Sequence, residues 1–373
     1  MMNRRHRRER GFSIVELMTA VTISLIMFSV IIELFASNKQ AYRLQEGASR
    51  LNENARYAVS HLQYFMRLAD HWGGIEAQNV SIETIPAVAG TDCSGAAVVS
   101  AVGFRGFNGA VTRPSALDCI PAENYETTTD LFFIRYGVQP SAGATDFTRA
   151  WPENGVPPAP QATVAPIYEA HFDDASSQGI WVSTLLGRRA AIFERSKFGD
   201  LPADLQINDN TINQGRGTYY RFQSMLYYVR PCSNPASGNN ATLCDSGDDG
   251  VPSLVRRTLN PNMTFTEQTV VSGVENMQLL YGVDNNADFV ADQYETAAAI
   301  DTNADWDKVV TVRVRLIVAN TERDTTLKTG DNDTREYFSL DPSEDPWKPP
   351  QEARQFRRNQ YDFTVQIRNM TRA

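Results

Sequence analysis

The sequence lacks the short motifs that mark several large classes of enzyme. It contains no G-x-S-x-G, no H-E-x-x-H, no G-x-x-x-x-G-K and no G-x-G-x-x-G, which argues against hydrolase, zinc-protease, P-loop and dinucleotide chemistry. Only four histidines occur in 373 residues, and His61 and His71 fall on or just beyond a long predicted helix. The alternative is a glycosidase-type carboxylate pair, but the acids are scattered. We expect no enzyme activity, no small-molecule substrate and no required cofactor.

Positive charge is also scarce outside the first eleven residues. The formal net charge is −9, and residues 1–11 hold five of the 35 basic residues but only one acid. Without them the chain has 30 basic and 43 acidic residues and a charge of −13. Nucleic-acid binding needs clustered lysine and arginine on the working surface, so it is not expected here.

No lysine or arginine occurs between Phe12 and Phe35, and this stretch is strongly apolar. As a helix these residues would span ~36 Å, against about 30 Å of hydrocarbon in a bilayer. The arginines before the stretch predict a cytoplasmic N-terminus and a body on the other side of the inner membrane. A secretory signal would place a small-residue cleavage site after its apolar region, whereas here Gly11 precedes it.

Helical patterning continues beyond the apolar stretch. Small and apolar residues recur every three or four positions: Ala41, Leu44, Ala48, Leu51, Ala55, Ala58, Leu62, Phe65 and Ala69. No proline occurs between Phe12 and Asp70, and Gly73-Gly74 follows as a stop signal. We predict one helix of about 59 residues, ~88 Å long. Its apolar half is 12–35 and its amphipathic half is 36–72, packed on a sheet or on other helices.

Residues 73–373 have the texture of a β-rich globular domain with long loops. Runs of branched and aromatic residues predict strands at Leu131–Ile134, Tyr219–Val229, Leu254–Leu259, Val309–Val318 and Tyr361–Ile367. Breaker-rich loops occupy 140–166 and 320–350. No internal repeat is present. The fold class is therefore α+β, with one long helix packed on a single β-rich body.

The N-terminal residues resemble a known signal. An arginine-rich leader, 1–11, ends in Gly11 and is followed by Phe12-Ser13-Ile14-Val15-Glu16-Leu17-Met18. This arrangement resembles the class III signal of type IV prepilins and of type II secretion pseudopilins. Weaker resemblance to the later strands of PilW-type minor pilins is found at 253–257, 273–284 and 306–314, and Met66–Ala69 looks similar to the end of their long helix. The chain is longer than a usual major pilin.

The resemblance implies a pilin-like fold and a set of partners. A prepilin peptidase would cleave between Gly11 and Phe12 and methylate the new amine of Phe12. The carboxylate of Glu16 would then pair with the Phe12 amine of a neighbouring subunit, which offsets its cost of about 2.5 to 3.5 kcal/mol in lipid. Other implied partners are minor pilins, the major pilin, the inner-membrane assembly machinery and a tip adhesin.

The function that this resemblance favours is a minor pilin that helps to initiate type IV pilus assembly, at or near the tip of a pilus on the cell surface. The alternatives are a minor pseudopilin of a type II secretion system and a tip-located binding or adhesion module. The sequence does not choose among motility, adhesion and DNA uptake.

Four cysteines, Cys93, Cys119, Cys232 and Cys244, all follow the apolar segment. An even number of cysteines outside the cytoplasm favours disulfides. Four cysteines allow three pairings, and proximity in the chain favours Cys93 with Cys119 and Cys232 with Cys244. A zinc site is disfavoured because no C-x-x-C pair is present.

An acidic stretch at 284–295 has the spacing of a calcium loop. Oxygen-bearing side chains occupy positions 1, 3, 5, 9 and 12, and position 7 would offer a carbonyl; the six residues are Asp284, Asn286, Asp288, Asp292, Glu295 and Val290. Phe289 stands where glycine is expected at position 6. The other interpretation is a solvated turn between two strands, and the sequence leaves both open. The acidic stretch 245–250 is a weaker candidate.

Overall fold

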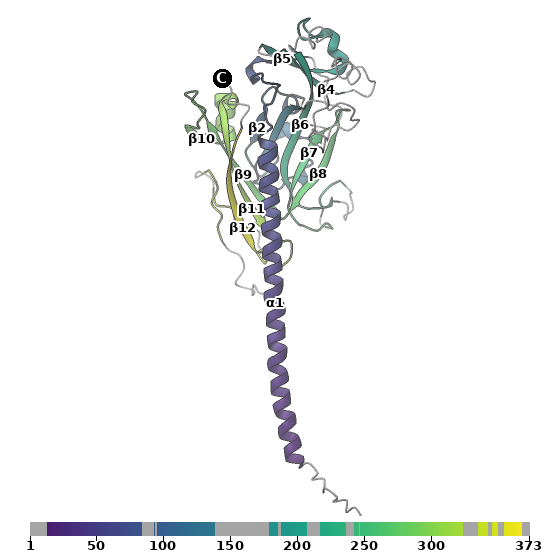
Figure 1. Ribbon diagram of the computed structural model, residues 1–373, viewed down its shortest axis with the longest axis vertical. Coiled ribbons are helices and arrows are strands. Elements are labelled where there is room, and N and C mark those ends of the chain that lie inside the picture. The colour runs from purple at the N-terminus through teal and green to yellow at the C-terminus, as the bar shows by residue number, and fades with distance from the viewer. Residues whose placement is uncertain are drawn as a thin grey trace, which may run out of the picture.

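The computed structural model describes residues 13–83, 93, 95–138, 179–185, 188–206, 217–235, 242–245, 247–323, 335–341, 345–349 and 354–367. The leader 1–11, Phe12 and the proline-rich stretch 140–166 lie outside these ranges. In the described part, one long helix carries a β-rich body at its C-terminal end (Figure 1). This is the α+β arrangement expected from the sequence.

The long helix α1 runs from Ile14 to Met66 and is capped by Ser13, whose hydroxyl accepts a hydrogen bond from the backbone of Val15. Its buried residues are Gly47, Leu51, Ala55, Ala58, Leu62 and Met66. The prediction that Leu51, Ala55, Ala58 and Leu62 lie on the buried face of the helix is therefore confirmed. Ala41 is exposed because the body begins to cover the helix only near Leu44 and Gly47, and Ala48, one position beyond Gly47, is also exposed.

The predicted end of the helix at Asp70 is wrong by about one turn. Residues 67–70 form turns, and Asp70 adopts a left-handed conformation with φ 64°. Its backbone N–H donates to the carbonyl of Arg135 at 2.9 Å rather than to a helix carbonyl. The chain thus leaves the helix to join the sheet, which periodicity along one segment does not reveal.

The larger sheet has eight strands in the described residues. Its order is β1 (Val80–Ile82), β5 (Arg189–Glu194), β4 (Ile180–Leu185), β6 (Gly217–Arg230), β3 (Leu131–Val138) and β2 (Phe104–Phe107), with β7 (Ser253–Leu259) beside β6 and β8 (Phe265–Ser272) beside β7. Strand β6 has 14 residues and pairs on one edge with β3. Its other edge is shared, since β4 pairs with 217–221 and β7 with 225–230.

The smaller sheet is antiparallel, with the order β10 (Gln293–Glu295), β9 (Val274–Val283), β11 (Val309–Ala319) and β12 (Arg358–Gln366). Short helical segments connect the strands: α2 (Gly95–Val98), α5 (Ala297–Asn303) and 3-10 turns at Ala77–Asn79, Ser115–Leu117, Ala122–Asn124, Arg195–Asp200 and Trp306–Lys308. All five strands predicted from composition are present. Strands β1, β2, β4, β5, β8 and β10 were not predicted, and β9 was indicated only by the resemblance at 273–284.

The C-terminal part of α1 lies between the two sheets (Figure 1). One core combines Ala55, Ala58 and Leu62 of the helix with Phe132 and Tyr227 of the larger sheet. Valines and other apolar residues of β9 and β11 close the same core from the smaller sheet. The amphipathic half of the helix therefore packs on sheets rather than on other helices, and the small alanines permit the close approach.

The larger sheet is buried on both faces around β3. Residues Phe132, Ile134 and Tyr136 face the helix core, while Leu131 and Phe133 alternate into a second core that also contains Trp72. This alternation is the period of two expected of a strand. Both faces are covered, so nearly every residue of β3 is apolar and buried.

Candidate assembly site

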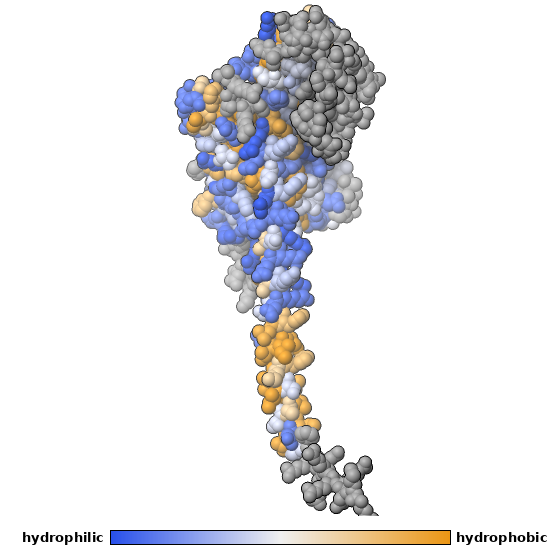
Figure 2. Space-filling view, in the orientation of Figure 1, coloured by the Kyte–Doolittle hydropathy of each residue, from blue (hydrophilic) through white to orange (hydrophobic). Residues whose placement is uncertain are grey.

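The N-terminal half of α1 projects away from the body as a bare apolar rod (Figure 1). None of its apolar segment is buried within the described chain. Large side chains from Ile14, 77% exposed, to Phe35, 71% exposed, form the apolar band below the body in Figure 2. This helix is long and apolar enough to cross a membrane, and its surface has no protein partner within the described chain.

Glu16 lies in the first turn of this rod. The helix N-terminus carries partial positive charge, which favours an acidic residue there. Thr19 donates its hydroxyl to the backbone carbonyl of Glu16 at 2.9 Å. No residue in the described ranges forms an ion pair or hydrogen bond with the Glu16 carboxylate, and the side chain is exposed. A partner for this carboxylate must come from outside the described part of the chain.

Gly11 and Phe12 lie outside the described residues, so the cleavage site itself has no geometry to report. Helical structure begins two residues after Phe12, at Ile14. Along a helix, position 12 would lie ~6 Å below Glu16. A neighbouring helix shifted by about this distance would bring its first residue level with Glu16.

The helix meets the body along a polar seam at its midpoint. A Cβ added to Gly47 would come within 2.4 Å of the Asn320 side chain, so glycine permits this close approach. Further along, Tyr361 of β12 donates its hydroxyl to Asn52 at 2.7 Å. The side chain of Asn54 donates to the carbonyl of Ser272 at 3.3 Å. These contacts fix the angle at which the apolar rod leaves the body.

Both disulfides have the pairing favoured by sequence proximity. Cys93 bonds to Cys119 and Cys232 bonds to Cys244, with Cα atoms 4.5 and 5.7 Å apart. Cys232, Cys244 and Asp248 lie close enough together to suggest a metal site. Because both sulfurs are in the disulfide, neither is a free thiolate for metal binding.

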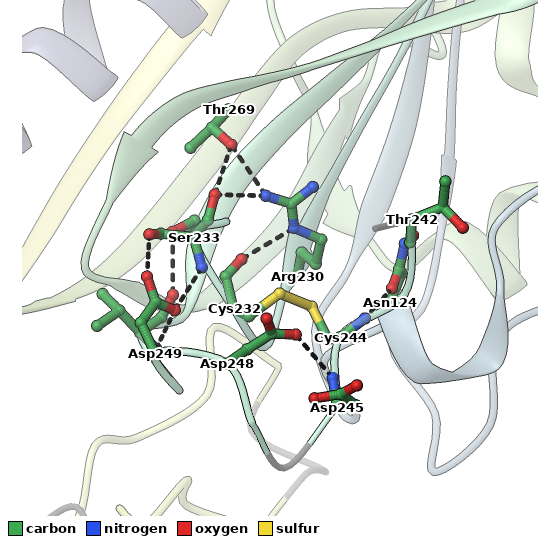
Figure 3. Close-up of a disulfide and its surroundings, with 12 residues drawn as sticks. Asn124, Arg230, Cys232, Ser233, Thr242, Cys244, Asp245, Asp248, Asp249 and Thr269 are labelled. Carbon is green, nitrogen blue, oxygen red and sulfur yellow. Dashed lines mark hydrogen bonds between the residues drawn. A yellow bond between two sulfur atoms is a disulfide. The ribbon is translucent and has the colours of Figure 1, made fainter. Parts of the chain in front are cut away.

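Hydrogen bonds tie the second disulfide to the end of β6 and to the turn at Ala122–Asn124 (Figure 3). Arg230 donates to the carbonyl of Cys232 at 2.9 Å and to the Thr269 hydroxyl at 2.9 Å. On the other side of the bond, Asn124 accepts from the backbone of Cys244 at 2.8 Å. A side chain of the acidic stretch 245–250 also bonds to this region, since the Asp249 carboxylate accepts from the backbone N–H of Ser233 at 2.9 Å. In the structure these residues belong to a loop that is held by hydrogen bonds.

Within the acidic stretch 284–295, residues 284–292 form the hairpin connection between β9 and β10, and 293–295 are β10 itself. The Asp284 carboxylate accepts from the backbone N–H groups of Ala287 and Phe289, both at 2.7 Å, and of Asn286 at 3.1 Å. Although burial raises the pKa of Asp284, these hydrogen bonds lower it, and the net direction is downward. Phe289 has φ 66°, the conformation that the expected glycine would adopt.

Other oxygens of this connection also bond within it. Asp292 accepts from the backbone of Asn285 at 2.7 Å, and Asp288 accepts from Val290 at 2.9 Å. Glu295 accepts from Gln293. Among the described residues, the carboxylates of this connection do not gather as a group of three metal ligands. The calcium site stays a prediction, and the hydrogen bonds account for the conformation without an ion.

A cavity of about 220 Å³ lies where the ends of the two sheets meet. Its lining includes Glu126, Glu275, Trp347 and Phe356. Burial raises the pKa of Glu126, and the charge of Glu275 raises it further, to about 7. The cavity is mixed in character, with acidic and aromatic walls, and none of its residues was singled out from the sequence.

Sequence reasoning found the apolar stripe of the helix but missed the polar contacts that hold the helix to the body. Gly47 carried a usable signal, because glycine inside a helix costs about 1 kcal/mol relative to alanine and calls for a packing reason. Its partner Asn320 carried none, since it lies 273 residues away in a predicted loop. His61 has a packing role, since it lies 3.1 Å from the Tyr227 hydroxyl and contacts the ring of Phe65.

Comparison with known proteins gives two family matches. Residues 240–369 match the family described as Type IV Pilus-assembly protein W, and residues 6–32 match the prokaryotic N-terminal methylation motif. The first match contains β7 to β12 and all three body stretches singled out by resemblance; the stretch Met66–Ala69 lies outside both matches. No curated protein and no solved structure matches the chain.

Proposed function

We propose that this chain, which the two family matches support as a PilW-family type IV pilin, is a minor pilin that helps to initiate pilus assembly. The proposal includes a position at or near the pilus tip. Its partners would be other minor pilins, the major pilin, the prepilin peptidase and the inner-membrane assembly machinery. The family matches indicate a structural pilin rather than an enzyme.

One observation carries the proposal. The apolar N-terminal half of α1 projects from the body without any covering side chains, and it has one carboxylate, Glu16, in its first turn. The rod is fully exposed in the described chain, and the Glu16 carboxylate has no partner there. Lipid can cover the apolar side chains but cannot neutralise a carboxylate. A neighbouring subunit can do both, because its helix is apolar and its cleaved N-terminus is a cation. This complementarity supports assembly through α1.

The orientation in the membrane follows from charge. Five arginines precede Gly11, which favours a cytoplasmic leader and a periplasmic body before assembly. The two disulfides lie in the body, where an oxidising compartment allows them to form. After cleavage, the mature subunit would move from the inner membrane into the pilus on the cell surface.

The shape of the body supports a position at the tip. Strands β4 and β5 lie beyond the C-terminal end of α1, and the two sheets spread to either side of it (Figure 1). A subunit within the shaft must accommodate neighbours both above and below its body. At the tip the upper face needs no pilin partner. A surface, or a tip adhesin, could then contact that face.

The test is substitution of Glu16 with the other pilins present. Glu16→Ala and Glu16→Gln should leave membrane insertion and cleavage after Gly11 intact. Both should lower incorporation into sheared surface pili, and crosslinks to other minor pilins, by roughly tenfold, the effect of losing about 1.4 kcal/mol of association free energy. The matched control is Glu33→Gln, at the other end of the same apolar segment.

Wild-type incorporation of Glu16→Ala would overturn the assembly role of this carboxylate. An equal loss in Glu33→Gln would point to a general effect of charge on the helix instead. The pseudopilin alternative shares the N-terminal signal, so the partners must decide it. Affinity purification of the mature chain from its native membrane should recover pilus components; recovery of type II secretion components instead would favour the alternative.

A further inference from the structure

A polar groove lies between α1 and the body, just above the apolar rod. It has a volume of about 300 Å³. One wall is the helix around Arg43 and Gly47, and the other is formed by the segment after β11 and the residues around the start of β12, including Arg323 and Arg357. In Figure 2 the helix surface changes from apolar to hydrophilic at this level.

The groove is positively charged although the chain is acidic. Its lining holds three arginines, Arg43, Arg323 and Arg357, and one acid, Glu322. Glu322 is already paired, because Arg50 bonds to it at 3.1 Å and to Glu46 at 2.7 Å. No described residue forms an ion pair with Arg43 or Arg323, and both side chains are exposed. The Arg43 and Arg323 guanidinium groups can therefore bind an anion.

The position of the groove matches the surface of a membrane. Arg43 lies ~12 Å along the helix from Phe35, the last residue of the apolar segment. Lys39 lies midway, ~6 Å from Phe35, on the same face of the helix as Arg43. Side chains on a helix lean toward its N-terminus, which here means toward the membrane. Long basic side chains also reach down to the interface readily. Both cations can thus meet the headgroup layer.

We propose that this groove holds the phosphate headgroup of an anionic phospholipid, in the leaflet on the side of the body. A guanidinium presents two parallel N–H donors that match phosphate oxygens. The Asn320 and Asn359 side chains in the same lining supply neutral amide donors. The site goes beyond the proposed function, since the lipid would be bound while the subunit is in the membrane, before it joins a pilus. It would hold the body at a fixed height and angle before assembly.

The experiment uses the full mature chain in a neutral detergent. Phosphatidylglycerol should raise its melting temperature by several degrees, and phosphatidylcholine with the same acyl chains should raise it less. Inorganic phosphate at the same concentration should have little effect, because it lacks the acyl chains that place the headgroup beside the helix. Native mass spectrometry of the same samples should find retained phosphatidylglycerol.

The paired variant Arg43→Gln with Arg323→Gln should lose the preference for phosphatidylglycerol. The matched control, Arg56→Gln with Arg188→Gln, removes two exposed arginines away from the groove and should keep it. Arg43→Lys with Arg323→Lys retains the charge and should keep part of it, which guards against a folding defect in the glutamine variant. Glu16→Gln should keep the full preference, so this test is independent of pilus assembly.

Three results would overturn the proposal. An equal rise with phosphatidylcholine would mean that the acyl chains alone stabilise the protein. An equal rise with inorganic phosphate would mean a free-anion site rather than a lipid site. Equal loss in the groove variant and its control would mean that total charge, and not this groove, sets the preference.

Discussion

Arg358, at the start of β12, and Glu275, in β9, form a buried ion pair across the intervening strand β11. Nη2 of Arg358 donates to one carboxylate oxygen at 2.9 Å and Nε donates to the other. The two side chains are 0% and 7% exposed. The pair therefore holds the edge strand β12, against which the helix packs, by a charge interaction shielded from water.

Loss of the Glu275 charge should be costly because it removes the buried carboxylate that pairs with the Arg358 guanidinium. We expect Glu275→Gln to lower the free energy of unfolding by about 3 kcal/mol. The control is Asp362→Asn, since Asp362 pairs with Arg315 at 2.6 Å but is 43% exposed. That change should cost about 1 kcal/mol or less. Denaturant unfolding of the mature chain in detergent measures both, and equal losses would contradict the prediction.

The buried carboxyl of Asp70 should make stability depend on pH. Burial raises its pKa from the usual 3.8 to about 7, despite hydrogen bonds from Trp72 at 2.8 Å and Gly103 at 3.2 Å that lower it. The folded state therefore binds the proton more tightly than the unfolded chain. Stability contributed by this group falls as pH rises from about 4 to about 7, and then levels off.

Asp70→Asn should flatten this pH dependence. Both hydrogen bonds reach Oδ1, which the asparagine carbonyl can replace, and asparagine tolerates the left-handed conformation. We expect the variant to melt above the parent at pH 8 and close to it near pH 4. Asp118→Asn, at an exposed site, serves as the substitution control. Parallel melting curves of parent and Asp70→Asn across this range would refute the assignment.

The Cys232–Cys244 disulfide closes a short loop, since its two cysteines are 12 positions apart in the sequence. Replacing both residues with serine should lower the free energy of unfolding by about 3 kcal/mol, chiefly through the freedom regained by the unfolded chain. Non-reducing peptide mapping of the parent should find this bond and Cys93–Cys119. Recovery of crossed pairs, or of free thiols, would show the pairing to be wrong.

The connection at 284–295 can be tested for calcium by melting. Asp284→Ala should lower the melting temperature even in chelator, because three backbone N–H groups lose their acceptor. A calcium site would add a rise in the parent with calcium over chelator, lost in Asp288→Ala. Equal melting in calcium and chelator would leave the connection as a hydrogen-bonded turn.

Processing of the leader gives the last prediction. Mature protein from the native membrane should begin at Phe12 and carry an N-methyl group, as intact-mass and N-terminal peptide analysis can show. Gly11→Leu should block cleavage because the peptidase is expected to need a small residue there. Gly199→Leu is the matched control, because a side chain at this glycine would meet no atom within 4 Å. An unprocessed parent N-terminus would remove the prepilin assignment.

The sequence alone determined the features that depend on one contiguous segment. The apolar stretch 12–35, the upper helix stripe and five strands follow from local composition and period. The leader with Gly11, Phe12 and Glu16 resembles the prepilin signal, and residues 6–32 match the prokaryotic N-terminal methylation motif. Both disulfide pairings followed from short separations along the chain.

Only the tertiary structure decided which distant segments meet. Three features each join residues that are far apart in the sequence: the contact of Asn320 with Gly47, the ion pair of Arg358 with Glu275, and the polar groove between α1 and the body. It also ended the helix at Met66, since Asp70 bonds to β3 instead of continuing the helix. Local propensity records the preferences of a segment in isolation. Long-range packing, buried charge and shared edges arise only when both sheets close around the helix, so no single segment encodes them.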